Sequence, residues 1–263
     1  MTPNVLLIDG LNVLRRIYEA QPQDAPEREA HSAAGARGVI RRARQAVAPS
    51  HALCVFDGVP PTWRHALYPA YKAGRPPTPE AVRRAAAELA DLLREDGLPS
   101  YTLEHTEADD VIATVARALA GRDIPVTLLS TDSGYSQLLG PRVRQLDPVH
   151  MTFRDAAWCR QRFGVDPPRF ADYLALAGSA SDHLPGAPGV GPKRAATLLG
   201  AHGDLEAVLE AAPRLGGRLG EALAAERERL LLYRRLATLR DDLALDLNLR
   251  ALRLDPPATP AAT

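Results

Sequence analysis

The order of apolar and polar positions divides the first half of the chain into short, continuously apolar segments and longer amphipathic ones. The apolar segments have the length and aliphatic content of buried strands and lie at Val5–Ile8, Ala52–Phe56 and Val126–Leu129. Helical patterns separate or precede them, chiefly at 34–47, 79–95 and 110–120. Strands that alternate with helices in this way are typical of a parallel α/β sheet. A further short strand is predicted from Val143 to Asp147.

An aspartate follows each of the three apolar segments, at Asp9, Asp57 and Asp132. The carboxyl ends of the strands in a parallel sheet share one edge, and ligands bind at that edge. Taken alone, each aspartate would more simply form a turn. Their common position favours a joint role in binding.

A second group of acids begins the helical pattern at 110–120 and comprises Glu107, Asp109 and Asp110. Thr106 can cap that helix, and one or two acids in its first turn would suit the helix dipole. Three carboxylates so close together repel one another at neutral pH unless a cation lies between them. A divalent metal ion bound through oxygen is the usual partner. With the aspartates at the strand ends, this cluster predicts a metal site.

The segment from 60 to 80 is rich in proline and carries basic and aromatic residues. Its prolines prevent one long helix, so we expect Arg64, Lys72 and Arg75 on a mobile or partly ordered crossing and not in a core. Lys72 and Lys193 are the only lysines in the chain. A retained ammonium group can supply a compact charge for function, or it can be a chance feature of a solvated face.

The second part of the chain reads as helical, with patterns at 155–163, 170–177, 195–199, 204–211 and 221–239. A glycine-rich hairpin, Gly189 to Arg194, opens the third of these helices. Its free backbone N–H groups, beside Lys193, can bind a phosphodiester backbone without reading sequence. The glycine spacing does not match a Walker A loop. Residues 255–263 are mostly Pro, Ala and Thr, which predicts a disordered tail.

Composition narrows the possibilities further. The chain has 263 residues, 46% of them hydrophobic, enough for one large domain with a smaller appendage. Its formal net charge is zero, which does not exclude nucleic acid, because acids in a metal site can offset bases elsewhere. Cys54 and Cys159 match no metal spacing and indicate buried thiols in a reduced, cytoplasmic protein. Neither a membrane-spanning stretch nor a signal-peptide pattern is present in the sequence.

Six short motifs follow one another along the chain: Leu7-Ile8-Asp9-Gly10, Phe56-Asp57-Gly58, Tyr71-Lys72-Ala73-Gly74-Arg75, Glu107-Ala108-Asp109-Asp110, Ser130-Thr131-Asp132 and Gly186-Ala187-Pro188-Gly189-Val190-Gly191-Pro192-Lys193. This ordered set resembles the bacterial 5′ to 3′ nucleases, a family that includes the N-terminal domain of DNA polymerase I and stand-alone flap endonucleases. The match runs from Val5 to about Leu199. The short length, with no polymerase portion, is typical of the stand-alone Xni (exonuclease IX) branch.

The resemblance implies a PIN-like parallel-sheet nuclease domain at 1–164, with a helical arch at about 60–95. A helical region at 165–250 would carry a helix-three-turn-helix DNA-binding element, similar to a helix-hairpin-helix, and 251–263 would form the tail. The implied activity is that of a Mg²⁺- or Mn²⁺-dependent 5′ flap endonuclease and 5′–3′ exonuclease in DNA repair or replication. The expected partner is branched or 5′-flap DNA, bound by a monomer in the cytoplasm and away from membranes.

The family's functional positions fall on specific residues of this chain. The implied metal ligands, direct or through water, are Asp9, Asp57, Glu107, Asp109, Asp110, Asp132 and Asp182. The implied catalytic residues are Lys72, which matches the arch lysine that contacts the scissile phosphate, together with Arg75, Asp109 and Asp110. DNA contacts are expected from Arg64, Tyr71, Lys72, Arg75, Gly189, Val190, Gly191, Pro192, Lys193 and Arg194. A potassium ion on main-chain carbonyls is expected near Leu176, Ala177, Pro185, Ala187 and Val190.

Two positions depart from the family pattern. Gly134 stands where polymerase-type members have the second aspartate of Thr-Asp-x-Asp, and Ser179 stands where they have the first aspartate of Gly-Asp-x-x-Asp. Both replacements remove carboxylates from a second metal site and leave Asp182 as its main remaining ligand, so this site is expected to bind weakly or only with substrate. Two other functions therefore stay open: a DNA-structure-binding protein with weak or no nuclease activity, and a PIN-type ribonuclease.

Overall fold

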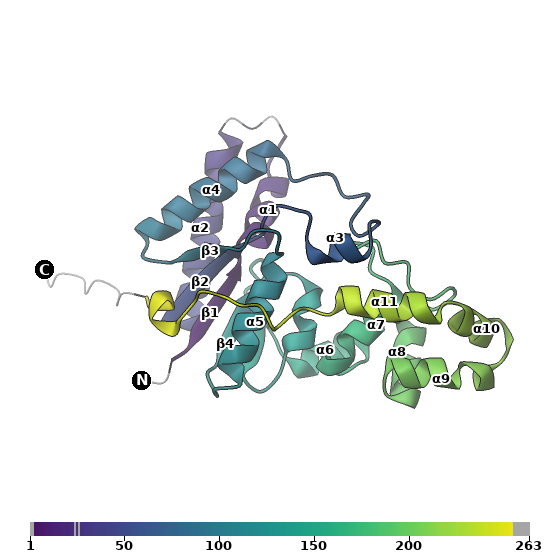
Figure 1. The fold of residues 1–263 in the computed structure, drawn as a ribbon. Coiled ribbons are helices and arrows are strands. Elements are labelled where there is room, and N and C mark those ends of the chain that lie inside the picture. Colours follow the sequence, from purple (N-terminus) through teal and green to yellow (C-terminus); the bar gives the residue numbers. More distant parts are fainter. Residues whose placement is uncertain (1–2, 24, 26, 255–263) are drawn as a thin grey trace, which may run out of the picture.

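The structure, a computed structural model, describes residues 3–23, 25 and 27–254 and is built around a six-stranded sheet (Figure 1). The strand order is β3-β2-β1-β4-β5-β6. The strands are β1 (Val5–Asp9), β2 (His51–Phe56), β3 (Ser100–Thr102), β4 (Val126–Leu129), β5 (Val143–Leu146) and β6 (Phe153–Arg154). All neighbours pair in parallel except β5 and β6. Because β1 pairs with both β2 and β4, the strand order reverses beside β1, which is where such sheets bind ligands.

Helices cover both faces of this sheet and confirm the predicted α/β class. The helices of this part are α1 (Gly10–Ala20), α2 (Arg28–Val47), α3 (Trp63–Leu67), α4 (Glu80–Glu95) and α5 (Ala108–Ala120). Leu6 and Ile8 of β1 pack with α1, α2 and α4 on one face, whereas Val5 and Leu7 pack with α5 on the other. This alternation follows from the two-residue period of a strand.

The segment predicted as an arch, 60–95, divides into two parts with different surroundings. Its second part is α4, whose Leu89 and Leu93 are buried in the same core as α2. The first part consists of the short helix α3 and the connection that follows it, which cross from the sheet towards the C-terminal helices (Figure 1). Helix α4 therefore belongs to the sheet domain, and only the crossing leaves it.

The C-terminal helices form a separate hydrophobic core that includes Phe170, Leu205 and Tyr233. They are α6 (Ala156–Phe163), α7 (Phe170–Ala177), α8 (Pro192–His202), α9 (Leu205–Leu215), α10 (Gly217–Ala225) and α11 (Arg227–Ala237), with short 3₁₀ turns at Ser133–Leu138 (η1), Pro167–Arg169 (η2) and Leu249–Leu252 (η3). The prediction of a single helix at 221–239 is wrong, because the helical conformation is interrupted at Glu226 between α10 and α11. The helix predicted at 195–199 is longer, since Pro192 begins it at a position where a missing N–H costs nothing.

After α11 the chain returns to the sheet domain as an extended C-terminal strap, 238–254, that runs along α5 (Figure 1). Leucines on the strap pack against the α5 core, and the backbone N–H of Leu254 donates to the carbonyl of Ser50 at 3.0 Å. The predicted tail, 251–263, therefore begins too early, since Leu252 and Leu254 are buried. Its remaining part, 255–263, lies outside the described residues. Among the described residues, no helix combines the length and the apolar character needed to cross a bilayer.

Candidate metal centre and nucleic-acid interface

A cleft of about 720 Å³ opens at the carboxyl edge of β1, β2 and β4. Five of the predicted acids line it: Asp9, Asp57, Asp109, Asp132 and Asp182. They come from five separate segments of the chain, and the topology of the sheet brings four of them to one edge. The basic side chains of Lys72 and Arg75 line the same cleft.

Backbone and hydroxyl donors orient the aspartates that follow the strands. Asp9 caps α1 by accepting the backbone N–H of Asn12 at 3.0 Å, and its other oxygen accepts the Ser130 hydroxyl at 3.1 Å. Asp57 accepts the backbone N–H of Ala108, the first residue of α5, at 2.8 Å. Asp132 accepts the N–H of Gly134 at 2.6 Å. Each aspartate is thus held by its own turn or by the neighbouring element, with at least one oxygen near the cleft.

The crowding of these carboxylates shows in their proton affinity. Burial, and next the charge of Asp57, raises the pKa of Asp9 to about 7. Burial, followed by Asp132 and Asp9, raises the pKa of Asp109 well above its usual range. Burial raises the pKa of Asp57 and of Asp132 as well. Ionising all of these carboxylates together is therefore unfavourable, which is the condition that a divalent cation relieves.

Oxygen-rich, acid-lined and partly solvated, this cleft fits Mg²⁺ or Mn²⁺ chemically. Within 3–23, 25 and 27–254, no group of three or more Asp, Glu, His or Cys side chains is arranged to hold a metal ion in the free protein. Hydrogen bonds from Asn12, Ala108 and Gly134 hold individual oxygens of the aspartates, so a bound ion would have to share these carboxylates with existing donors.

The prediction that Asp110 lies with the other metal ligands needs correcting. Its side chain is fully buried outside the cleft, where it accepts Nη1 and Nη2 of Arg64 at 2.8 and 2.7 Å, the Trp63 indole N–H at 2.8 Å and the Arg240 backbone N–H at 2.9 Å. Successive residues of a helix point about 100° apart, so Asp109 and Asp110 cannot face the same site. Asp109 lines the cleft, and Asp110 contacts α3 and the strap.

The predicted position of Arg64 needs correcting as well. It was expected on a mobile crossing and in contact with DNA, yet its side chain is 2% exposed and sits between α3, α5 and the end of α11. Besides Asp110, it donates to Glu107 Oε2 at 2.5 Å and to the carbonyls of Leu236 and Thr238 at 2.8 and 3.3 Å. Sequence reasoning missed this because the partners lie far away along the chain.

Glu107 lies between the buried arginine and the cleft. Its Oε1 is 2.7 Å from the Lys72 ammonium, and its Oε2 accepts Arg64 and the Tyr71 hydroxyl. Although burial alone would favour its neutral form, Lys72 and then Arg64 lower the pKa of Glu107. Burial likewise favours the neutral amine of Lys72, but Glu107 together with Tyr71, Asp109 and Asp182 outweighs burial, and the pKa of that lysine is raised. Both groups are therefore charged and paired at neutral pH.

The arch crossing is docked onto the loop that carries Asp182. Lys72 donates its backbone N–H to the carbonyl of Asp182 at 3.3 Å, and its ammonium lies 3.9 Å from Asp182 Oδ1. The backbone N–H of Gly74 donates to Nδ1 of His183 at 2.9 Å. This docking closes one side of the cleft and brings Asp182 within reach of the other acids.

The two positions that lack the family carboxylates now form hydrogen bonds with the acids that remain. Gly134 donates its N–H to Asp132, and the Ser179 hydroxyl donates to Asp182 Oδ2 at 2.6 Å. Uncharged donors thus stand where like-charged neighbours would otherwise repel Asp132 and Asp182.

Three side chains in or directly behind the cleft were not predicted from the sequence; two of them line it, and Tyr135 is buried behind it. The Tyr135 hydroxyl donates to Asp109 Oδ1 at 2.6 Å and reaches Asp9 Oδ2 at 3.4 Å. Arg15 and Arg16 of α1 also line the cleft, and the buried Nε of Arg15 has no hydrogen-bond partner among the described residues. The amphipathic pattern of α1 could have identified the two arginines, whereas nothing in the sequence marks Tyr135.

The glycine-rich hairpin forms a separate, open hollow of about 570 Å³, lined by Gly189, Gly191, Pro192, Lys193 and Arg194. Arg194 donates to the carbonyl of Gly189 at 2.8 Å, which ties the hairpin to the first turn of α8. Val190 is 5% exposed and packs in the helical core, so its side chain is unavailable to a ligand and only its backbone can contribute. At the predicted potassium positions, two carbonyls already accept backbone hydrogen bonds. The carbonyl of Leu176 accepts the N–H of Ala187, and the carbonyl of Ala187 accepts the N–H of Val190.

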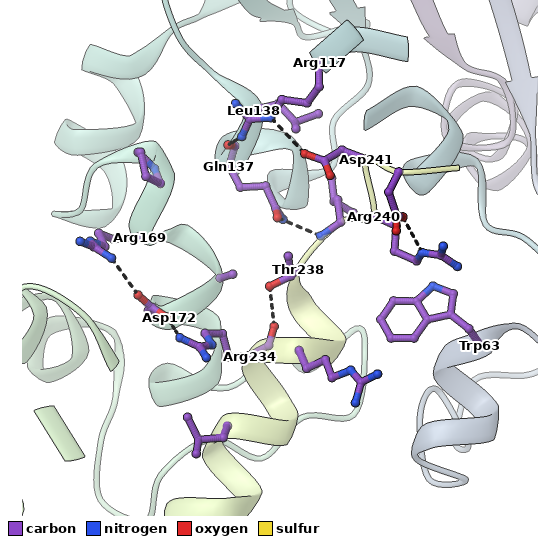
Figure 2. Close-up of a pocket in the computed structure, with 16 residues that line it drawn as sticks. Trp63, Arg117, Gln137, Leu138, Arg169, Asp172, Arg234, Thr238, Arg240 and Asp241 are labelled. Carbon is purple, nitrogen blue, oxygen red and sulfur yellow. Dashed lines mark hydrogen bonds and ion pairs between the residues drawn. The ribbon is translucent and has the colours of Figure 1, made fainter. Parts of the chain in front are cut away.

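A larger groove of about 1010 Å³ lies between α5, α7 and the end of α11 (Figure 2). It contains several arginines, but Arg117 lies 3.9 Å from Asp241, Arg169 lies 3.8 Å from Asp172, and Arg240 lies 2.9 Å from Asp242. These pairs neutralise much of its positive charge. The groove therefore lacks the concentration of free cationic groups that attracts nucleic acid.

Comparison with known proteins identifies two adjoining family regions. Residues 4–164 match the model of the 5′-3′ exonuclease N-terminal resolvase-like domain, and residues 165–260 match that of the 5′-3′ exonuclease C-terminal SAM fold. Among curated relatives, Flap endonuclease Xni of Cronobacter sakazakii is 38% identical over 256 residues, covering 97% of this chain and 99% of that protein. Flap endonuclease Xni of Tolumonas auensis is also 38% identical, over 259 residues and with the same coverage.

Two solved structures share the fold. The T5 D15 protein co-crystallised with metal ions superposes with a TM-score of 0.76 at 22% identity, covering 90% of this chain and 89% of that one. The catalytic core of Rad2 in complex with DNA substrate superposes with a TM-score of 0.63 at 17% identity, covering 97% and 84%.

Proposed function

Because the chain belongs to the 5′-3′ exonuclease family, we propose that it is a structure-specific 5′ nuclease that hydrolyses phosphodiester bonds in branched DNA. It would act as a flap endonuclease, as the names of its relatives state for those proteins, and as a 5′–3′ exonuclease, as the description of its family implies. The observation that carries the proposal is the convergence of five aspartates on a cleft that also contains Lys72 and Arg75. An anionic phosphodiester can approach so many carboxylates only with cations between them.

We assign Mg²⁺ or Mn²⁺ binding to the carboxylates of the cleft. Asp9, Asp57 and Asp109 would form the stable site, with Glu107 acting from the adjoining side, and Asp132 and Asp182 would hold a second ion. Bound ions of this kind stabilise charge on a phosphate and lower the pKa of water. Asp110 has no part in this assignment, because Arg64, Trp63 and Arg240 occupy its oxygens.

The basic residues of the arch would orient the scissile phosphate. Lys72 is paired with Glu107 in the free protein, at a site next to the aspartates. A phosphate entering the cleft would compete for that ammonium, and the charge of Lys72 would then stabilise the developing negative charge. Arg75, which lines the same cleft, would add a second cation, and Tyr71 packs beside Lys72 with its ring 4.9 Å from the ammonium.

We assign the duplex portion of the substrate to the hairpin at Gly189–Arg194. Its open hollow, glycine backbone and two basic side chains suit a phosphodiester backbone that is bound without sequence readout. A potassium ion bound by carbonyls near Leu176 and Val190 remains part of this proposal.

A second candidate function is a DNA-structure-binding protein with weak or no nuclease activity. Gly134 and Ser179 favour it, because both lack the carboxylates that a second divalent ion would use, and the Ser179 hydroxyl instead donates a hydrogen bond to Asp182. This candidate keeps the hairpin and the basic arch but predicts no metal-dependent cleavage. A PIN-type ribonuclease is less well supported, since the hairpin favours duplex DNA.

The deciding experiment uses a labelled 5′-flap DNA with Mg²⁺ or Mn²⁺ and compares wild type with Asp109→Asn. The nuclease assignment requires cleavage by wild type and its loss in the variant. A matched control is Asp123→Asn, because Asp123 is an exposed partner of Arg142 outside the cleft. Intact binding with no cleavage at any metal concentration would leave only the second candidate. The same flap made of RNA tests the ribonuclease.

We also propose that the protein acts as a monomer in the cytoplasm, where its relatives would process bacterial DNA. The two cysteines, Cys54 and Cys159, are both free and buried, as the sequence predicted. Sedimentation of the free protein and of its DNA complex tests the monomer.

A further inference from the structure

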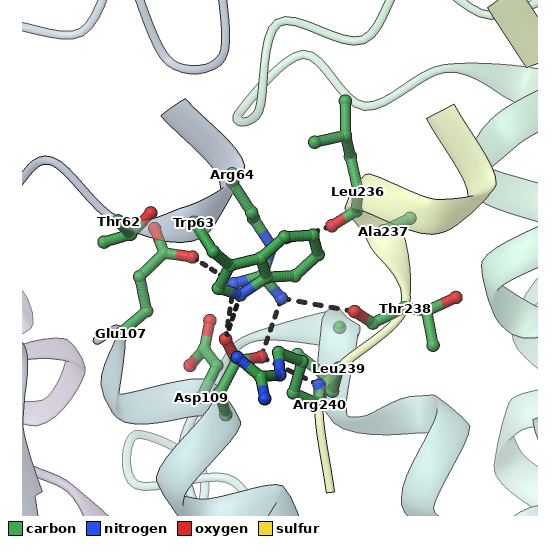
Figure 3. Close-up of polar contacts among 12 residues, drawn as sticks. Thr62, Trp63, Arg64, Glu107, Asp109, Leu236, Ala237, Thr238, Leu239 and Arg240 are labelled. Atoms are coloured by element: carbon green, nitrogen blue, oxygen red, sulfur yellow. Dashed lines mark hydrogen bonds and ion pairs between the residues drawn. The ribbon is translucent and has the colours of Figure 1, made fainter. Parts of the chain in front are cut away.

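The buried contact between Arg64 and the first turn of α5 joins three parts of the chain that are remote in sequence. We call the set Arg64, Glu107, Asp110 and the carbonyls of Leu236 and Thr238 the arginine junction (Figure 3). Arg64 comes from α3, the two acids come from the start of α5, and the carbonyls come from the end of α11 and the strap. One guanidinium therefore links the arch crossing, the metal-binding helix and the C-terminal region.

The geometry of the junction uses the planar fork of arginine. Two nitrogens meet the two oxygens of Asp110 at 2.7 and 2.8 Å, and one of these nitrogens also meets Glu107 at 2.5 Å. Nε points the other way, to the carbonyl of Leu236 at 2.8 Å. A lysine ammonium lacks this fork and could not bind all these acceptors together.

The junction holds the two acids that flank Asp109. Asp109 and Asp110 are successive, and only one residue separates Glu107 from them, so a rotation or shift of this turn moves all three. With Glu107 and Asp110 fixed on one side, Asp109 is directed to the other, where it lines the cleft and accepts the hydroxyl of the buried Tyr135. Asp110 is fixed further by the backbone N–H of Arg240.

The junction also reaches the cationic side of the cleft. Glu107 binds Arg64 through Oε2 and Lys72 through Oε1 at 2.7 Å. The location of the Lys72 ammonium relative to Asp109 therefore depends on where Arg64 holds Glu107. Stability alone would also account for a buried ion pair, so only a measurement that separates folding from catalytic geometry distinguishes the two roles.

We propose that Arg64 is a positioning residue that sets the orientation of Asp109 and Lys72 through Glu107 and Asp110, and that Asp110 is its anchor and not a metal ligand. This inference rests on the proposed nuclease function. It assigns Arg64 no contact with DNA and no part in the chemical step. It requires that Arg64 and Asp110 act as one unit.

The test compares Arg64→Lys, Asp110→Asn and the double variant for kcat and KM on a 5′-flap DNA. Displacing reacting groups by about 1 Å can cost about 10²-fold in rate, so Arg64→Lys is expected to lower kcat by about that factor with KM changed by less than about threefold. Because the pair acts as a unit, the double variant should be no slower than the slower single variant. Multiplying losses in the double variant, or a raised KM with unchanged kcat, would overturn the proposal.

Trp63 supplies a readout that needs neither metal nor DNA. Its indole N–H donates to Asp110 at 2.8 Å, and the ring stacks over Arg64 at 4.5 Å. In a Trp158→Phe background Trp63 is the only tryptophan, since the chain has two. Its emission should shift in both Arg64→Lys and Asp110→Asn, and equilibrium Mn²⁺ binding should weaken in both. Unshifted emission together with wild-type Mn²⁺ affinity would refute the junction.

Arg37→Lys is the matched control for a merely structural arginine. Arg37 forms a comparable two-point contact with Asp96, at 2.7 and 2.5 Å, between α2 and the end of α4 and outside the cleft. Its variant should melt at a lower temperature but keep kcat per folded molecule. If Arg64→Lys behaves the same way, Arg64 only stabilises the fold.

Should Arg64→Lys not fold, the nearly isosteric Asp110→Asn decides by the same criteria. Wild type that cleaves no flap would refute the proposed function, whereas the emission and Mn²⁺ results would still judge the junction.

Discussion

The hydroxyl of Tyr135 lies 2.6 Å from Oδ1 of Asp109, and this contact joins the turn after β4 to the first turn of α5 behind the cleft. The tyrosine is 1% exposed, and burial, then the charges of Asp109 and Asp9, raise the pKa of its phenol well above the usual range. The phenol therefore stays neutral and donates a hydrogen bond to the Asp109 side chain. A neutral donor thus orients a residue that we assign to the metal.

Replacing Tyr135 with Phe removes this donor and leaves Asp109 with one partner fewer in a buried place. We expect the free energy of unfolding to fall by roughly 1–3 kcal/mol, the cost of leaving a buried acceptor without its donor. Mn²⁺ affinity should weaken as well, because Asp109 is no longer oriented. Urea unfolding and Mn²⁺ titration measure the two effects. Tyr101→Phe, on β3, is the control, and an equal loss there would argue against a specific role for Tyr135.

The raised pKa of Asp9, about 7, gives the metal-free protein an unusual pH dependence. A carboxyl whose pKa is higher in the folded than in the unfolded state stabilises the fold below the unfolded value and loses that contribution as pH rises through the folded value. Metal-free protein should therefore become less stable between pH 4 and pH 7 on account of this group, by up to about 4 kcal/mol. Thermal melting in chelator across this range tests the sign.

In the same experiment, Asp9→Asn should reduce that pH dependence and raise the melting temperature at pH 8, while it weakens Mn²⁺ binding. Saturating Mn²⁺ should reverse the trend in wild type, because the ion replaces the protons. The prediction is contradicted if metal-free wild type becomes more stable from pH 4 to pH 7 and Asp9→Asn shows the same pH profile.

The two lysines separate chemistry from substrate binding. Lys72 lines the cleft and Lys193 lines the hairpin hollow. We expect Lys72→Ala to lower kcat by roughly 10²–10³-fold, the effect of losing one electrostatic donor at a reacting phosphate. Lys193→Ala should weaken DNA binding in all sequence contexts and reduce its salt slope by about 1, with kcat nearly unchanged. Steady-state kinetics and salt-dependent binding measure both, and exchanged phenotypes would reverse our assignment of the two sites.

Restoring the two missing carboxylates tests the explanation for the depleted second site. A Cβ at Gly134 would lie 3.1 Å from Asp132 Oδ1, and the Ser179 hydroxyl already lies 2.6 Å from Asp182, so aspartates at these positions would stand beside the remaining acids. Gly134→Asp with Ser179→Asp should tighten the second Mn²⁺ by roughly ten- to a hundredfold and raise the cleavage rate. Gly134→Asn with Ser179→Asn controls for side-chain size. Unchanged Mn²⁺ stoichiometry and rate would show that the depletion does not limit activity.

The sequence by itself determined the sheet and the place of the site. Short apolar runs identify β1, β2 and β4, and the carboxyl ends of parallel strands must share an edge, so Asp9, Asp57 and Asp132 converge without further information. Asp109, in the first turn of α5, was also correctly associated with that edge, whereas Asp110 was not. Proline in the crossing and glycine in the hairpin marked irregular backbone because their effects are local.

Tertiary structure alone decided which of these acids faces the cleft. Asp109 and Asp110 are identical in kind and adjacent in sequence, and only the surroundings of α5 show that one meets Tyr135 and the other meets Arg64. Arg64 was expected outside a core because its acceptors cannot be read locally: the carbonyl of Leu236 is 172 residues away. Local rules fix periodicity and backbone conformation, whereas the burial of a charge depends on partners that folding brings from elsewhere in the chain.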